Sequence, residues 1–323
     1  MTANHTTRDL LERGAARLVG RSDSPALDAE LLLAHVLGQP RARFRSHPED
    51  VPGAAAGARF LELIGRRERG EPLAYIVGYK HFWTLKLAVT PAVLVPRPET
   101  ELLVERALAL RPGPMANVVD LGTGSGAIAL ALASERPLWQ VTATDVSADA
   151  LAVARSNASA LGLARVEFIE GNWLEPLGGR KFDVIVSNPP YIGVDEPEMA
   201  SPALRYEPRG ALTPVAHAPG AAAPLPEARV STGAHGAEPR PAGPGTVAPR
   251  TTALASLRSI IHSAPPHLEH GGWLLLEHGS TQAAEVAREL VGRGFSHVRS
   301  HRDLAGHERM TEGQWPHSEQ RWP

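Results

Sequence analysis

The fold is decided by one stretch of the chain, residues 117–135, which reads NVVDLGTGSGAIALALASE. Apolar β-branched residues come first, three glycines follow within five positions, and a run of alanine and leucine of helical length completes it. A strand that enters a helix through closely spaced glycines is typical of a cofactor-binding turn, because glycine lets the backbone bend sharply and lets a ligand approach without a Cβ in the way. The stretch therefore predicts the first strand and helix of an α/β domain.

The segments that follow continue this alternation of strands and helices. Strand-like runs stand at QVTATD (140–145), VEFIEG (166–171) and FDVIVSN (182–188), with the helical run ADALAVARSNASALG (148–162) between the first two. A later strand-like run, GGWLLLEHG, is flanked by two helical patterns, and a last part is compatible with two antiparallel strands. Such alternation indicates a mostly parallel sheet covered by helices on both faces.

The rest of the chain divides into further parts. Residues 1–75 carry helical patterns and predict a small helical domain. Residues 76–98 are rich in aromatic and β-branched residues and predict a β-hairpin connector. The α/β domain is expected over 99–315. Within it, residues 213–250 are mostly Ala, Pro and Gly, which predicts a flexible insert, and residues 316–323 predict a frayed tail.

Composition limits the classes of protein to which the chain can belong. Its 323 residues suffice for two domains, and 43% hydrophobic with 21% charged residues is usual for a globular protein. A formal net charge of −2 argues against a protein that holds nucleic-acid phosphates over its whole surface. Without cysteine there are no disulfides or thiolate sites, and no apolar run is long enough to span a bilayer, so we expect a cytoplasmic protein. The histidines between His262 and His278 lack the spacing of metal ligands, and no metal is expected.

The glycine turn alone leaves two classes of cofactor open. Gly122, Gly124 and Ala127 satisfy the dinucleotide pattern G-x-G-x-x-G/A, and the acidic residue expected on the next strand to bind the ribose hydroxyls is present as Asp145. Asp120 favours S-adenosyl-L-methionine instead. A carboxylate two residues before the first glycine would attract a cationic amino-acid ligand and repel a pyrophosphate.

The tetrapeptide Asn188-Pro189-Pro190-Tyr191 directly follows a predicted strand. Proline cannot donate to a sheet ladder, so the strand must end there and a rigid loop must follow. The lone pair of an amide nitrogen or of an exocyclic base amino group is spread into a π system, so a methyl acceptor of this kind must have its two N–H bonds held in a fixed direction. The side-chain oxygen of Asn188 and the carbonyl of Pro189 can accept these bonds. The tetrapeptide and Asp120 together predict S-adenosyl-L-methionine and methyl transfer to a planar nitrogen.

The segments DLGTGSG, ATD, GNW and VSNPPYI, in this order, resemble those of class I S-adenosylmethionine-dependent methyltransferases that act on planar nitrogen. This resemblance implies a Rossmann-like α/β fold with a mostly parallel seven-stranded sheet. Upstream, VLVPRPETE and DAELLLAHVLG resemble the glutamine methyltransferases that modify peptide chain release factors. The resemblance implies that the helical domain of residues 1–75 recognises the substrate. That family methylates the side-chain amide nitrogen of the glutamine in a Gly-Gly-Gln motif, which implies a protein-glutamine N-methyltransferase that acts in translation termination.

The resemblance and the turn chemistry assign roles to residues. Asn188, Pro189 and Tyr191 are expected to be catalytic, and together with Pro190 they would bind the substrate amide. Trp173 would lie beside the adenine, although a core aromatic is nearly as good an interpretation. The expected cofactor-binding residues are Asp120, Gly122, Thr123, Gly124, Ser125, Gly126, Asp145, Trp173 and Asn188.

Three charged residues, Arg205, Glu207 and Arg209, follow the tetrapeptide and match a family segment that could order the substrate loop, but a solvated charged turn is the default. Glu277 ends a core strand and is expected to be structural. The expected partner is a release factor, with no stable nucleic acid, no membrane and a monomeric enzyme. The alternatives are a ribosomal-protein glutamine methyltransferase, a nucleic-acid adenine N6 methyltransferase, and a cofactor-binding scaffold without turnover. A basic recognition face would favour the adenine methyltransferase.

Overall fold

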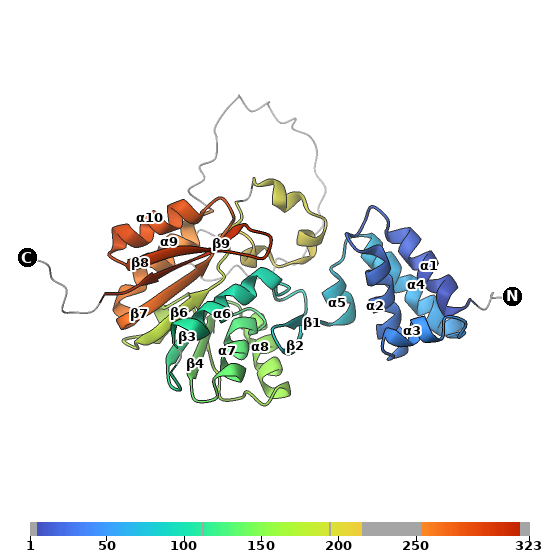
Figure 1. Cartoon of the computed structure of the whole chain (residues 1–323), viewed down its shortest axis with the longest axis horizontal. Helices are drawn as coiled ribbons and strands as arrows, with labels where there is room; N and C mark the ends of the chain where they lie inside the picture. The colour runs from blue at the N-terminus through green and yellow to red at the C-terminus, as the bar shows by residue number, and fades with distance from the viewer. Residues whose placement is uncertain (1–4, 112, 194, 215–252, 317–323) are drawn as a thin grey trace, which may run out of the picture.

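The computed structural model describes residues 5–111, 113–193, 195–214 and 253–316. A helical part at the N-terminus is followed by a two-stranded hairpin and then by a larger part in which helices flank a sheet (Figure 1). In the described parts of the chain, no helix has the length and apolar character that a bilayer crossing requires. The predicted insert and tail fall outside these parts, except for Thr213, Pro214 and Pro316.

The N-terminal part contains four helices, α1 (Thr7–Leu18), α2 (Pro25–Leu37), α3 (Ala42–Ser46) and α4 (Ala54–Glu68). Helix α1 begins at a capping box, in which the Thr6 hydroxyl accepts from the Asp9 backbone N–H at 3.2 Å and the Asp9 carboxylate accepts from the Thr6 N–H at 3.0 Å. The apolar faces of α1, α2 and α4 meet in one core that includes the fully buried Phe60. This core is separate from those of the sheet.

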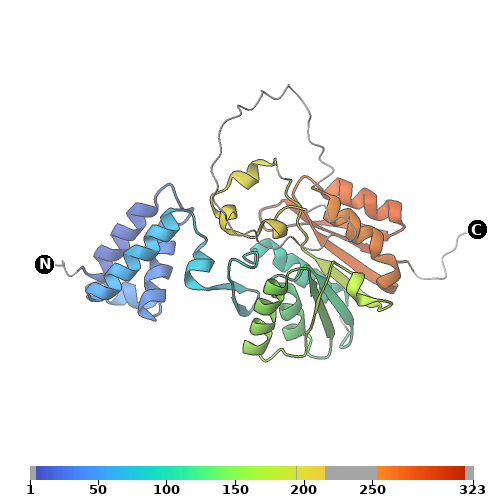
Figure 2. The same ribbon diagram turned by 180° about the vertical axis from the view of Figure 1, so that it is seen from behind.

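A short connector joins the helices to the sheet. It consists of α5 (Leu73–Val77) and an antiparallel hairpin of β1 (Tyr79–Phe82) and β2 (Leu85–Ala88). The expected connector began at Ile76, but Ile76 and Val77 are helical, because α5 starts after Pro72 and buries Ile76 in the N-terminal core while Tyr75 packs against the loop beyond β2. The views from both sides show α5 between the helical part and the sheet (Figures 1 and 2).

The main sheet has seven strands in the order β5-β4-β3-β6-β7-β9-β8. All neighbours pair in parallel except β9, which is antiparallel to β7 and β8. The predicted fold class, α/β with a mostly parallel seven-stranded sheet, is confirmed. The strands are β3 (Asn117–Leu121), β4 (Gln140–Asp145), β5 (Glu167–Glu170), β6 (Phe182–Ser187), β7 (Leu268–Glu277), β8 (Ser296–Arg302) and β9 (Glu308–Gln314).

Helices cover both faces of this sheet. On one face α6 (Glu101–Leu110), α7 (Ala127–Glu135) and α8 (Ala148–Ala160) bury an apolar core, and on the other α9 (Ala255–Ser263) and α10 (Ala283–Arg293) bury a second core. The central strands are apolar without alternation because both of their faces are covered. Short 3-10 turns complete the chain at η1 (Pro98–Thr100), η2 (Glu175–Leu177), η3 (Pro197–Ala200), η4 (Ala203–Tyr206), η5 (Arg209–Ala211) and η6 (Pro265–His267).

The order of the strands reverses between β3 and β6. From β3 the chain moves outward through β4 and β5, and then crosses back to β6 and continues to β7 on the other side. In open α/β sheets the crevice at such a reversal, at the carboxyl ends of the strands, is the usual ligand site. The glycine turn after β3 and the tetrapeptide after β6 both lie at this point.

Candidate active site

A large cavity of about 1090 Å³ opens at the carboxyl edge of the sheet. Its walls come from the turns after β3, β4, β5 and β6, from residues 92–100 before α6, from residues 208–211, and from the start of α9. The predicted site residues that line it are Gly122, Thr123, Gly124, Ser125, Asp145, Trp173, Asn188 and Pro190. Asp120, Gly126, Pro189 and Tyr191 are not part of its lining.

The glycine turn after β3 is held in a left-handed backbone conformation. Gly122, Gly124 and Gly126 have φ of 70°, 56° and 84°, values that L side chains rarely adopt. The N–H groups of Gly122 and Thr123 both donate to the Thr144 carbonyl, at 2.8 and 3.0 Å, which fixes the turn against β4. A Cβ at Gly124 would meet nothing within 4 Å, so its backbone is open to a ligand in the cavity.

Asp145 stands at the end of β4 and is tied to the turn. Its carboxylate accepts from the Gly124 N–H and from the Ser147 N–H, both at 2.9 Å. Burial raises the pKa of this carboxyl, while the backbone N–H groups partly offset the rise. Each carboxylate oxygen has further lone pairs, so a ribose hydroxyl in the cavity can still donate to it.

Asp120 lies beneath the turn and is fully buried. Its Oδ2 accepts from the Thr123 hydroxyl at 2.6 Å and from the Ala129 N–H at 3.2 Å, whereas Oδ1 has no hydrogen bond. Burial, and to a smaller extent the charge of Asp145, raises the pKa of Asp120 to about 7. Asp120 therefore holds the glycine turn to the start of α7 through Thr123 and Ala129. Direct contact with a cofactor stays a prediction for this residue.

Trp173 combines the two roles that its sequence left open. The indole lines the cavity and also packs against the apolar core beneath α9 and α10. Its backbone has φ of 47°, which is uncommon for a residue of this size. A hydrogen bond of 2.9 Å from the Thr144 hydroxyl to its carbonyl holds this conformation.

The tetrapeptide begins directly after the last residue of β6. Asn188 is half-buried and lines the cavity, and its Nδ2 donates to the Thr100 hydroxyl at 3.1 Å. Pro189 is buried, and Pro190 reaches the cavity. The Tyr191 hydroxyl donates to Glu277 Oε1 at 3.3 Å, and burial raises the pKa of this phenol.

Glu207 connects two segments of the cavity wall, residues 208–211 and residues 92–97. This side chain is fully buried and accepts from Arg97 at 2.6 Å and from the Val95 N–H at 3.2 Å. The default interpretation, a solvated turn, is therefore wrong for Glu207, because its partners lie more than 100 positions upstream, at the residues before α6. Arg205 and Arg209 are exposed, as that interpretation expected.

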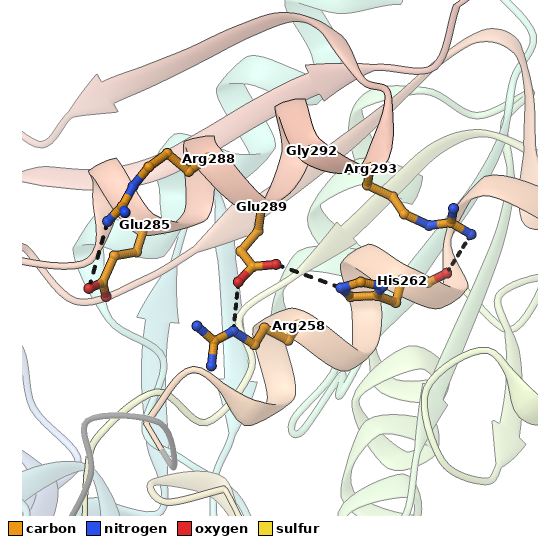
Figure 3. Close-up of a pocket in the computed structure, with 7 residues that line it drawn as sticks. All are labelled: Arg258, His262, Glu285, Arg288, Glu289, Gly292 and Arg293. Carbon is orange, nitrogen blue, oxygen red and sulfur yellow. Dashed lines mark hydrogen bonds and ion pairs between the residues drawn. The ribbon is translucent and has the colours of Figure 1, made fainter.

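Helix α9 is held to α10 by a cluster of ion pairs beside a separate hollow of about 420 Å³ (Figure 3). Glu289 accepts from Arg258 at 2.7 Å and lies 3.6 Å from His262, and Arg293 donates to the His262 carbonyl at 3.3 Å. The cluster fixes the helix whose first turns place Ser256 and Ser259 on the cavity. Among the described residues no group of three or more His, Asp or Glu side chains is arranged to hold a metal ion.

Two site residues, Thr100 and Glu277, were not predicted to act at the site. Thr100 lines the cavity, and Glu277 lies behind the tetrapeptide. The available signal was position, because Glu277 stands at the carboxyl end of a central strand, where ligands bind in this class of fold. The identity of its neighbours could not be obtained from local sequence.

The fold and the site together define a class I methyltransferase, with the glycine turn after the first strand of the sheet and the tetrapeptide Asn188–Tyr191 after the fourth in chain order. Two family models match, the PrmC N-terminal domain over residues 9–78 and the methyltransferase small domain over residues 98–202. The chain belongs to the release factor glutamine methyltransferase family.

Curated relatives with that name cover nearly the whole chain. The Pseudomonas aeruginosa protein is 46% identical over 91% of this chain and 94% of its own length. The Yersinia pestis protein is 43% identical over 94% of this chain and 97% of its own length, and the Vibrio cholerae protein is 40% identical over 91% of each. Among solved structures, the catalytic domain of hMettl16 is 15% identical with a TM-score of 0.50 over 82% of each chain, a likeness of fold alone.

Proposed function

We propose that this enzyme transfers the methyl group of S-adenosyl-L-methionine to the side-chain amide nitrogen of the glutamine in the Gly-Gly-Gln motif of peptide chain release factors. The observation that carries the proposal is the placement of Asn188. Its Nδ2 is engaged by Thr100, so the carboxamide oxygen is left to accept a hydrogen bond at the cavity. An acceptor in that place suits a substrate whose nitrogen carries two N–H bonds.

The cavity fits S-adenosyl-L-methionine. One cavity is lined by the open backbone of Gly124, by Asp145, which can accept from a ribose hydroxyl, by Trp173 and by Asn188. Asp120 adds a buried carboxylate beneath the turn, with a charge of the sign that an amino-acid cation requires. When bound, this cofactor supplies an electrophilic methyl group and a positive charge that disappears during transfer.

The chain's own residues act by positioning. Asn188 Oδ1 and the Pro189 carbonyl would accept the two N–H bonds of the substrate amide, and Pro190 fixes the direction of that carbonyl because its ring leaves little backbone freedom. Tyr191 is not part of the cavity lining, so its expected place beside the planar group stays a prediction. No strong general base is needed, because the transfer dissipates charge and the amide proton can leave afterwards. Catalysis then rests on orientation and preorganised acceptors.

The protein substrate has room beside the cofactor. A cavity of about 1090 Å³ is large for one cofactor molecule, and its remaining wall is formed by residues 92–97 and 208–211. We assign this wall to the Gly-Gly-Gln loop and the N-terminal helices to the body of the release factor. The domain limits predicted above, a monomeric enzyme, a cytoplasmic location and the absence of stable nucleic-acid binding belong to the same proposal.

Labelled S-adenosyl-L-methionine tests the substrate. It is offered with a purified release factor, a ribosomal-protein fraction and DNA in parallel, and label is mapped by mass spectrometry. We expect label on the Gly-Gly-Gln glutamine. Label on DNA, on a ribosomal protein alone, or on no Gly-Gly-Gln peptide would contradict the proposal.

The Asn188→Ala variant tests the site. We expect turnover to fall roughly 100-fold or more, because an acceptor preorganised for the transition state is lost. Cofactor affinity, measured by calorimetry, should change by less than about threefold, since the cofactor's main contacts are elsewhere. Unchanged turnover would remove Asn188 from the mechanism.

A further inference from the structure

Glu277 is a buried carboxyl group directly behind the tetrapeptide. Strands β6 and β7 are parallel, and Ser187 pairs with Leu276, so Asn188 and Glu277 leave the sheet side by side. Glu277 is 2% exposed and does not line the cavity. It therefore contacts the residues that hold the substrate without being in a position to touch the substrate itself.

The environment of Glu277 is costly for a carboxylate. Among the described residues it forms no salt bridge, and its Oε2 is buried without a hydrogen bond. Its Oε1 accepts a hydrogen bond from the Tyr191 hydroxyl at 3.3 Å. Burying an ionisable group that lacks an ion pair lowers stability, and an apolar residue would fill the same space at a smaller cost.

Thr100 links Glu277 to Asn188. It is the last residue of η1 and stands directly before α6, and its hydroxyl makes no capping hydrogen bond to that helix. Instead its Oγ1 accepts from Asn188 Nδ2 at 3.1 Å. A hydroxyl whose oxygen accepts must point its own proton elsewhere, and the Glu277 carboxyl lies close enough for this hydroxyl to favour the ionised form.

We propose that Glu277 is a positioning residue. Through the hydroxyls of Thr100 and Tyr191 it fixes Asn188 and Tyr191, the two ends of the tetrapeptide that would hold the substrate. As an acceptor, Glu277 draws the Thr100 proton toward itself and leaves Oγ1 to receive the Asn188 amide group. Asn188 Oδ1 is then turned to the cavity, and the Tyr191 ring is held by its hydroxyl. This inference rests on the proposed function.

The hydrogen bonds that run from Asn188 through Thr100 to Glu277, a relay, would reverse their direction if Glu277 could donate. A protonated Glu277, or a glutamine in its place, can donate to Thr100, and the threonine proton then turns to Asn188. The amide of Asn188 would flip and present its NH2 group to a substrate that also offers N–H bonds, and the two would repel each other.

Glu277 can be partly protonated at neutral pH. Burial raises the pKa of Glu277 to about 7, nearby Glu99 adds to the rise, and the Thr100 and Tyr191 hydroxyls with Arg309 oppose it. Because the protonated form is the less active one, wild-type turnover should rise with pH through this range. Asp120 also has a pKa raised to about 7, so the profile alone does not assign the group.

The variant Glu277→Gln separates charge from shape. We expect turnover on the release factor to fall roughly 10- to 100-fold because the acceptor is misaligned, with cofactor affinity unchanged. Its remaining activity should lose the rise with pH attributed to Glu277. Thr100→Val should lose turnover to the same degree and Thr100→Ser should restore it. The double variant Glu277→Gln, Thr100→Val should be no worse than either single one, because both act through one relay.

Glu312→Gln is the matched control. Glu312 is another buried carboxyl of the same sheet, 3% exposed, paired with Arg106 at 3.0 Å and not part of the cavity. Its replacement should lower the melting temperature and leave turnover and its pH profile as in the wild type. Glu277→Gln should instead melt at or above the wild-type temperature, since it removes a buried charge.

A readout without substrate keeps this inference separate from the proposed function. The side-chain amide signal of Asn188, followed by NMR in selectively labelled protein, should shift in Glu277→Gln and Thr100→Val and stay in place in Glu312→Gln. If wild-type enzyme methylates no release factor, the proposed function fails and this signal still decides the role of Glu277. Turnover of Glu277→Gln within about twofold of wild type, or an unmoved Asn188 signal, would overturn the inference.

Discussion

Gly122 brings the backbone of the cofactor turn against the ring of Trp173. A Cβ built at Gly122 would lie 3.0 Å from Trp173 Cζ3, and the backbone φ of 70° is itself unfavourable for an L side chain. Trp173 cannot move away freely, because its carbonyl is held by Thr144 and its own φ is positive. We therefore expect cofactor binding to depend on the lack of a side chain at Gly122.

The Gly122→Ala variant should bind S-adenosyl-L-methionine about tenfold more weakly, because the added methyl displaces the indole from the cavity at a cost of about 1 to 2 kcal/mol. Gly162→Ala is the control, since Gly162 has the same φ of 70° but nothing within 4 Å of its Cβ position. It should lower the free energy of unfolding by about 1 kcal/mol and leave cofactor affinity unchanged. Calorimetric titration and thermal unfolding measure the two quantities. Equal losses of affinity in both variants would show that strain at the backbone, and not the indole, is responsible.

At the level of elements, the sequence was most informative where structure is local. The strand, glycine turn and helix of residues 117–135 are consecutive in the chain, and their pattern predicted the fold that the sheet order confirms. The Ile76-Val77 pair was assigned to the hairpin because its residues favour strands. They are helical because burial between two cores outweighs intrinsic preference over so short a segment.

Contacts between site residues on distant elements could not be predicted. Asn188 lies 88 positions after Thr100 and 89 positions before Glu277 along the chain. The three residues are brought together by the register of β6 and β7 and by the start of α6. Likewise, Glu207 resembled a solvated charge until its partners before α6 were placed. Local patterns report what a residue can do chemically, and the sheet register decides with which neighbours it does so.

The contacts of Glu207 with Val95 and Arg97 predict an effect on both stability and substrate binding. Glu207→Ala leaves the Val95 N–H and the Arg97 guanidinium without their acceptor, so it should lower the free energy of unfolding by about 1 to 3 kcal/mol. It should also raise KM for the release factor, because two walls of the cavity separate. Glu49→Ala removes an exposed pair, Arg8 with Glu49, and should cost less than about 1 kcal/mol. Denaturant unfolding and steady-state kinetics of Glu207→Ala and Glu49→Ala measure these effects. Equal stability of the two variants would show that the contacts of Glu207 do not hold the cavity wall together.

On the scale of the whole molecule, the helical part and the sheet part contact each other beside the cavity. The views from both sides show the segment of η3 and η4 between them (Figures 1 and 2). Gly70, just after α4, lies against Pro202, and the Tyr206 hydroxyl donates to the Arg69 carbonyl at 3.4 Å. Residues 202–206 continue directly into Glu207 and the cavity wall. The position of the helices is thereby connected to the place where the substrate loop is expected.

The variant Gly70→Ala tests this connection. Its Cβ would come within 2.8 Å of Pro202 Cβ, and with a φ of 94° the residue cannot relax easily, so the helices must shift relative to the cavity wall. We expect KM for the intact release factor to rise roughly three- to tenfold, about 1 kcal/mol of lost binding, while affinity for S-adenosyl-L-methionine and KM for a short Gly-Gly-Gln peptide stay as in the wild type. Gly20→Ala, with a φ of 71° and open space around it in the same helical part, should change none of these constants. A Gly70→Ala enzyme that treats peptide and protein substrates alike would mean that the helices do not contribute to recognition from this position.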